Sequence, residues 1–82
     1  MEVEKNKIYR HFKGDLYLVE DIAINVETEE EVVIYRGLYE NCKMYTRSLN
    51  NFVEVLSKEQ QDKYGQEYRF VLMEIESKNK KD

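Results

Sequence analysis

Residues 16–24 read LYLVEDIAI, and this stretch decides the fold. Apolar side chains recur along it on one parity, at Leu16, Leu18, Ile22 and Ile24. That period of two is typical of a β-strand, and Glu20 interrupts it. We therefore expect one long strand that is bent or bulged near Glu20 and Asp21. A bent strand of this length is typical of a strand that two small sheets share.

The neighbouring segments predict more strands, separated by tight turns. A strand is expected over residues 7–13, followed by a turn at Gly14 and Asp15. A polar, acidic loop at 25–31 precedes a β-branched and aromatic strand at 32–39. A turn at 40–43 then leads to a short strand at 44–47, and Asn41 is the turn residue best suited to a left-handed conformation.

After Arg47 the apolar spacing becomes helical. Leu49, Phe52, Val53 and Leu56 predict a short helix or 3₁₀ turn. Ser57 followed by Gln60 fits a capping box, and Gly65 is placed to end a helix, so a second helical stretch is expected over 58–64. Residues 67–75, EYRFVLMEI, read as a closing strand.

Five short strands with a helix before the last one predict a mainly β protein. The expected architecture is a small, strongly bent antiparallel barrel of the SH3-like kind, because closure removes exposed strand edges. The competing architecture is an open antiparallel sheet packed by a helix at 49–64. We expect a single domain over residues 1–76 and a frayed polar tail over 77–82.

Composition limits the functions that this chain can carry. With 82 residues, a two-domain enzyme is excluded. Seven Tyr and three Phe are too many for a disordered chain, even with 37% charged residues. The net charge of −4 disfavours nonspecific binding to nucleic acids or anionic membranes. A single cysteine and the lack of a long apolar run lead us to expect a cytoplasmic protein that does not bind membranes.

Candidate ligand-binding residues combine aromatic rings with basic groups. Tyr9, His11 and Lys13 share one face of the first strand, where they could converge on an anionic or aromatic ligand. The full predicted set is Tyr9, His11, Lys13, Tyr17, Tyr39 and Arg47. Gly37 could let a ligand or another backbone approach closely. In the plainer interpretation, most tyrosines lie half-buried over a small core with their hydroxyls in water.

Charge is also polarised along the chain. The segment 5–14 carries four basic residues and no acid, whereas 20–31 carries six acidic residues and no base. The basic segment could contribute to a ligand-binding face, and the acidic run at 27–31 could bind a cation. They could equally be two solvated hairpins facing each other, joined by weak surface ion pairs.

Metal binding and catalysis have little support in the sequence. His11 is the only histidine, and no zinc or calcium-loop spacing is present, so we expect no metal and no cofactor. A lone histidine can act as a general base, but nothing in the sequence places Cys42 or Ser48 beside it as a nucleophile. We expect no catalytic residues.

Several ordered motifs resemble a bacterial family filed as domain of unknown function 1653. They are Tyr9 to Gly14 (YRHFKG), Glu27 to Glu31 (ETEEE), Val33 to Tyr39 (VIYRGLY), and Arg47 with Phe52. The family patterns are approximately YRHYKG, HSETxEE, VVYxxLY and WVRPLxxF, so the likeness covers roughly residues 7–56. This chain has Asn25-Val26 in place of His-Ser, Tyr45 in place of Trp and Ser48 in place of Pro. The resemblance implies a compact β domain in the cytoplasm of a bacterium and no particular activity.

The function we expect is that of a non-catalytic binding module. Its aromatic and basic residues would contact a protein or a small anionic ligand. The alternative is nucleic-acid or nucleotide binding through the same residues, which predicts a steep loss of affinity with salt. An enzyme or enzyme accessory that uses His11, and an obligate oligomer built through an exposed strand, are the two other hypotheses.

Overall fold

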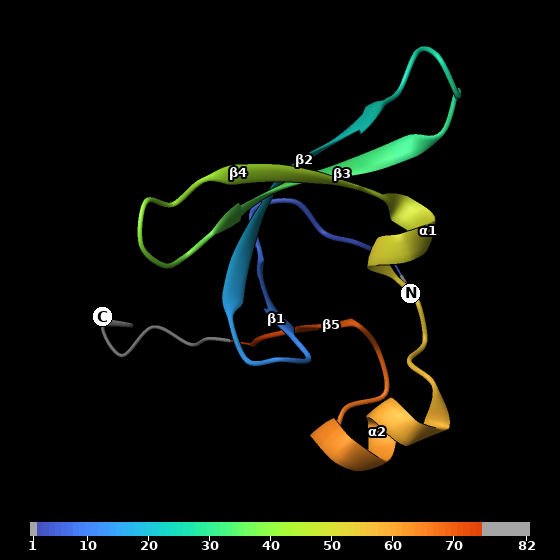
Figure 1. Cartoon of the computed structure of the whole chain (residues 1–82). Coiled ribbons are helices and arrows are strands. Elements are labelled where there is room, and N and C mark those ends of the chain that lie inside the picture. Colours follow the sequence, from blue (N-terminus) through green and yellow to red (C-terminus); the bar gives the residue numbers. More distant parts are fainter. Residues whose placement is uncertain (1, 75–82) are drawn as a thin grey trace.

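The computed structural model describes residues 2–74 and contains one antiparallel sheet of five strands in the order β4-β3-β2-β1-β5 (Figure 1). The strands are β1 (Ile8–His11), β2 (Leu16–Ile24), β3 (Glu31–Gly37), β4 (Met44–Ser48) and β5 (Phe70–Leu72), and the helices are α1 (Leu49–Phe52) and α2 (Lys58–Tyr64). The mainly β prediction, with helices before the last strand, is confirmed.

The long strand β2 organises the sheet as its sequence predicts. Its first residues pair with β1, from Ile8 opposite Leu18 to Arg10 opposite Leu16. Its whole length pairs with β3, and the register shifts between Val19 and Asp21, which is the expected bulge. Beyond the bulge, β3 lies between β2 and β4, because residues 32–34 pair with both strands, and the pair of Ile24 and Glu31 extends past the β3–β4 ladder (Figure 1).

The expected closed barrel is wrong, because the sheet remains open. Within residues 2–74, β4 pairs only with β3, and β5 pairs only with β1. β5 has only three residues, and the chain leaving β4 turns directly into α1. Phe52 of α1 stacks on Phe70 of β5, with ring centroids 4.0 Å apart and planes 3° apart. A side-chain contact therefore joins the two ends of the sheet where a barrel would have a hydrogen-bonded ladder.

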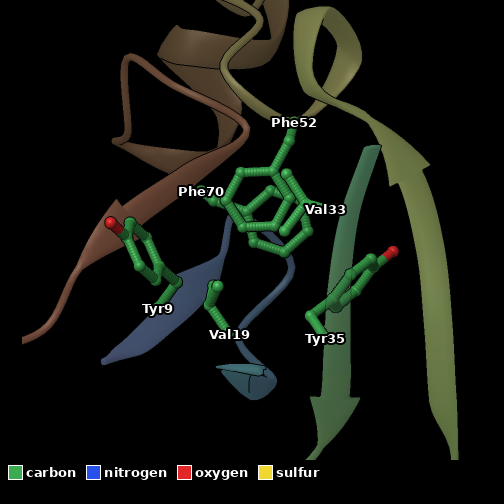
Figure 2. Close-up of a cluster of buried hydrophobic side chains, with 6 residues drawn as sticks. All are labelled: Tyr9, Val19, Val33, Tyr35, Phe52 and Phe70. Carbon is green, nitrogen blue, oxygen red and sulfur yellow. The ribbon is translucent and has the colours of Figure 1, made fainter. Parts of the chain in front are cut away.

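The core lies on the face of the sheet that α1 covers. Figure 2 shows its buried side chains, which are Tyr9, Val19, Val33, Tyr35, Phe52 and Phe70. They come from all strands except β4, together with α1. The helix α2, in contrast, buries none of its residues. The competing open-sheet architecture is thus closer to the structure, but only the first part of the 49–64 segment packs against the core.

The helix ends follow the local signals in the sequence. Ser48 caps α1 by accepting a hydrogen bond from the Asn51 N–H. Ser57 and Gln60 form the expected capping box at the start of α2, and Gly65 ends that helix with a left-handed φ of 69°. In the turn before β4, positive φ angles occur at Glu40 and Cys42, on either side of Asn41, so the expectation for Asn41 is wrong.

The last strand is shorter than the predicted 67–75. Gln66 is buried, and its side-chain amide donates to the Tyr68 carbonyl at 2.8 Å. Its Oε1 accepts from the Arg10 guanidinium, at 3.2 Å from Nε and 3.0 Å from Nη2. This network, which joins Gln66 to Arg10 in β1, holds 66–69 in an irregular path, so the strand begins only at Phe70. Residue 75, the expected domain end at 76 and the expected tail at 77–82 lie outside the described residues.

Replacing Phe52 tests whether its stack on Phe70 holds the open sheet together. We expect Phe52→Leu to lower the free energy of unfolding by about 1–3 kcal/mol, because the aliphatic chain leaves part of the ring's buried space unfilled. Val55→Ala, at a residue that is 53% exposed, should change it by less than about 0.5 kcal/mol. Urea unfolding of both variants provides the measurement, and equal effects would contradict this account.

Candidate functional site

Part of the core side of the sheet is not covered by α1, and there the structure gathers polar aromatic residues around one arginine. We call this surface the aromatic face; it comprises His11, Tyr17, Tyr39, Tyr45 and Arg47, together with Tyr35, which is buried in the core beneath them. The sheet register places them together. Val33 faces Arg47 and Tyr35 faces Tyr45 across the β3–β4 ladder. His11 faces Phe70 across the β1–β5 ladder, and the Phe70 ring lies 5.0 Å from the His11 ring and 5.5 Å from the Arg47 guanidinium carbon, so residues of the first and fourth strands lie on the same surface.

Arg47 is the cation of the aromatic face. Its Nε donates to the Tyr35 hydroxyl at 3.0 Å, and its Nη1 donates to Oδ1 of Asn51 in α1. The guanidinium carbon lies 6.0 Å from the Tyr35 ring centroid and 5.5 Å from that of Phe70. Within residues 2–74, none of its partners is a carboxylate. A half-buried positive charge is therefore fixed in place by neutral groups.

The tyrosines form a connected cluster beside this guanidinium. The ring of Tyr17 lies 5.3 Å from that of Tyr35, 5.6 Å from that of Tyr39 and 6.4 Å from that of Tyr45, centroid to centroid. The Tyr17 and Tyr39 hydroxyls are hydrogen-bonded at 3.0 Å. That hydrogen bond raises the pKa of Tyr39, and the neighbouring Tyr39 hydroxyl raises the pKa of Tyr45. Both phenols stay protonated at neutral pH and can donate as well as accept.

His11 is held neutral at the edge of the aromatic face. Burial, then the positive charges of Arg47, Arg69 and Lys13, lower its pKa from 6.5 to about 4, while Asp15 opposes them. Its Nδ1 accepts a hydrogen bond from the Lys13 backbone N–H at 3.1 Å, so the remaining proton of the neutral ring is on Nε2. His11 therefore offers a neutral hydrogen-bond donor near physiological pH.

The structure separates the six predicted binding residues. It brings His11, Tyr17, Tyr39 and Arg47 together on the aromatic face. Tyr9 lies instead in the core, 1% exposed, with its hydroxyl accepting from the Glu4 N–H at 2.9 Å. Strand β1 ends at His11, and the buried Phe12 directs Lys13 away to a groove beside α2. The expectation that Tyr9 and Lys13 converge with His11 on one ligand is thus corrected.

Gly37 makes room for a residue of the aromatic face. A side-chain carbon at this position would lie 2.7 Å from Cε1 of Tyr39, closer than atoms can pack. The expected close approach at Gly37 is thus made by the chain's own Tyr39 ring. The plainer interpretation of the tyrosines holds for three of the seven, because Tyr17, Tyr39 and Tyr68 are half-buried, whereas the other four are either buried or exposed.

The six predicted binding residues do not include Asn51, Phe70, Tyr35 or Tyr45. Asn51 follows Arg47 by four residues, a spacing that brings side chains together when a helix follows. Tyr35 shares its strand parity with Tyr39, and Tyr45 shares its parity with Arg47. Strand alternation therefore places both with residues of the predicted set. Phe70 reaches the site through the pairing of β1 with β5, for which no local signal exists.

The described residues show no assembled catalytic or metal site. Between residues 2 and 74, neither Cys42 nor Ser48 hydrogen-bonds to His11; Cys42 is exposed in a turn, and Ser48 caps α1. The same residues contain no cluster of three His, Cys, Asp or Glu that could hold a metal ion.

The basic segment 5–14 and the acidic segment 20–31 are joined by one ion pair among the described residues. It links Lys5 to Asp21 at 3.6 Å, and both side chains are largely exposed. No helix within 2–74 has the length and apolarity needed to cross a membrane.

Acid should weaken the fold through His11. Because its pKa is lower in the folded chain than in the unfolded one, the unfolded chain binds the extra proton between pH 6.5 and about 4. Stability is thus retained above pH 6.5 and lost as the pH falls towards 4. We expect a loss of about 1–2 kcal/mol, since solvent screens the half-exposed ring. Urea unfolding at pH 7 and 4.5 should show that His11→Gln removes this part of the pH dependence. An NMR titration giving a His11 pKa near 6.5 would contradict it.

Comparison with known proteins places the chain in a family. No curated protein matches the sequence. A crystal structure of a Bordetella bronchiseptica protein from the same family, DUF1653, superimposes with a TM-score of 0.71 at 32% sequence identity, covering 93% of this chain and 95% of that one. That fold was therefore already known from experiment. Residues 7–72 match the family described as "Protein of unknown function (DUF1653)", and this chain is a member of that family.

Proposed function

We propose that this protein is a non-catalytic binding module whose aromatic face contacts a protein segment or a small anionic ligand. The observation that carries the proposal is the charge on Arg47, which lacks an acidic partner within residues 2–74. A ligand carboxylate or phosphate would supply that partner. The surrounding rings would then contact the flat or apolar part of the ligand.

The other arginines show why Arg47 is unusual. Arg36 pairs with Glu20 at 2.8 Å, and Arg69 pairs with Glu54. Arg10 donates to neutral Gln66, but it is an exposed residue whose charge stays in water. Removing a charge from water costs free energy unless an opposite charge compensates it. Half-buried Arg47 is compensated by neutral groups but by no opposite charge, and its hydrogen bonds to Tyr35 and Asn51 fix its orientation in advance, which favours binding.

The exposed end of the aromatic face offers further contacts. A small pocket of about 100 Å³ lies between Tyr39, Tyr45 and Lys43 at the turn before β4. The phenols of Tyr39 and Tyr45 can donate hydrogen bonds to an anion, whereas the positive charge of Lys43 is offset by Glu40, which also lines the pocket. This pocket can hold only a small group, so we expect one side chain or one functional group of a ligand to enter it.

Nucleic acid remains the alternative occupant. Arginine and exposed rings are the groups that hold single-stranded bases. The net charge of −4 and the acidic residues at 27–31 act against a long phosphate backbone. These charges favour a short acidic peptide or a small anion over a nucleic acid.

The test is a titration of the ¹⁵N-labelled protein with 4-hydroxybenzoate, with an acidic, tyrosine-containing pentapeptide and with hexathymidylate. We expect the carboxylate probes to shift amides of residues 35–48 and 11–17. Arg47→Lys should weaken their affinity about tenfold, because an ammonium group cannot form the same paired hydrogen bonds. Tyr45→Phe should weaken it less.

Two controls accompany this titration. Tyr68→Phe removes a phenol outside the aromatic face and should leave the affinity unchanged. Far-UV circular dichroism checks that Arg47→Lys stays folded, since Arg47 also bonds Asn51. Affinity only for hexathymidylate, lost steeply with salt, would replace this proposal with nucleic-acid binding. No shifts at 11–17 or 35–48 with any probe would contradict both.

A further inference from the structure

A second groove lies outside the aromatic face, between α2 and the turn that joins β1 to β2. It has a volume of about 400 Å³. Phe12 and Lys13 line it from the turn, Glu59, Lys63 and Tyr64 line it from α2, and Arg69 lines it from the segment before β5. Figure 1 shows α2 set apart from the sheet, beside this end of β1 and β5. Volumes of this order are typical of small-molecule sites.

Two aromatic rings form the apolar part of the groove. Phe12 and Tyr64 meet edge to face, with centroids 4.9 Å apart and planes at 76°. Phe12 is buried, whereas Tyr64 remains 37% exposed. Tyr64 is the one aromatic residue of α2, and this helix buries none of its residues. An exposed ring on a helix that is otherwise polar can contact a flat ligand.

Cations surround these rings. Lys13 Nζ lies 5.8 Å from the Phe12 centroid, and Lys63 Nζ lies 5.3 Å from the Tyr64 centroid. In the part of the chain that the structure describes, neither lysine forms an ion pair. Glu59 is the acid in the lining, so these side chains leave the groove with a net positive charge.

Arg69 adds a guanidinium group to the groove. Its Nη2 pairs with Glu54, and its guanidinium carbon lies 5.8 Å from the Phe12 centroid. Its Nε–H is buried and has no hydrogen-bond partner among residues 2–74. Because this Nε–H has almost no accessible surface, Arg69 contributes to the groove its guanidinium, which Glu54 partly neutralises, and not this donor.

From this combination we infer that the groove binds an aromatic phosphate monoester of the size of a nucleoside monophosphate. The phosphate would lie between the lysines, where charge-assisted hydrogen bonds are strongest. The flat ring system would contact Tyr64 and Phe12. The inference does not depend on the proposed function, because none of these residues belongs to the aromatic face.

The test uses adenosine monophosphate, with adenosine and inorganic phosphate as component probes, at constant ionic strength. We expect the monophosphate to shift amides of residues 12–14, 59–64 and 66–69 in ¹⁵N spectra, with little change at 35–48. Adenosine and inorganic phosphate should each bind at least tenfold more weakly, because each lacks one half of the contacts. Nuclear Overhauser effects should connect the adenine protons with the Tyr64 ring.

Matched lysine variants locate the phosphate. Lys63→Gln and Lys13→Gln should each weaken the affinity about threefold or more, since both remove an exposed cation that lines the groove. Lys58→Gln, on the same helix but outside the lining, should leave it unchanged. Because all three lysines are exposed, the variants are expected to stay folded, and their amide dispersion checks this.

Several results would overturn the inference. One is the absence of shifts at 12–14, 59–64 and 66–69 with adenosine monophosphate. A second is that inorganic phosphate binds as tightly as adenosine monophosphate, which would show that the rings contribute nothing. A third is that adenosine binds as tightly, which would show that the phosphate contributes nothing. An equal effect of Lys58→Gln and Lys63→Gln would show only general charge attraction. Shifts confined to 11–17 and 35–48 would assign the nucleotide to the aromatic face.

Discussion

The stack of Phe52 on Phe70 is the contact on which the rest of this structure depends. The two rings are parallel and 4.0 Å apart, and they join the helix that follows β4 to the strand that pairs with β1. Without hydrogen bonds between β4 and β5 in the described chain, this contact brings the two ends of an open sheet towards each other. Tyr9 and Tyr35 each place a ring 5.5 Å from Phe52, so the stack is also the centre of the core.

The open end of the sheet follows from this arrangement and creates the aromatic face. Helix α1 has only four residues, so it covers the part of the core near Phe52 and leaves the tyrosines beyond it uncovered. The same helix supplies Asn51, which holds the Arg47 guanidinium in place. One short helix therefore both completes the core and orients the cation that we assign to ligand binding. A closed barrel would instead have needed hydrogen bonds between the edge strands β4 and β5, and the described residues form none.

Local features of the sequence predicted much of this fold, and contacts between distant segments account for what they missed. The bulge at Glu20 and the capping box at Ser57 depend on residues a few positions apart, and both were predicted at the right place. Barrel closure depends on how β5 meets β4, and the irregular path set by Gln66 and Arg10 shortens β5. No local pattern reveals a bond between residues 56 positions apart.

The candidate site shows the same division. Strand alternation correctly placed Tyr9 and His11 on one face, but it could not show that this face is the core side, where Tyr9 is buried. It also could not show that β1 ends at His11, which separates Lys13 from the others. The grouping of His11, Tyr17, Tyr39 and Arg47 was predicted because these residues combine aromatic or basic side chains with matching positions in the strand alternation.

The central claim is that Arg47 is an ordered cation available to an anionic ligand. The most direct measurement is the hydrogen exchange and chemical shift of its side-chain Nε–H in ¹⁵N spectra, with and without a carboxylate ligand. Our account predicts slow exchange, because Nε donates to Tyr35, and a shift when the carboxylate is added. The Nε–H of Arg36, already paired with Glu20, should not shift. Fast exchange at Arg47, as in a free arginine, with no response to any anion, would contradict the account.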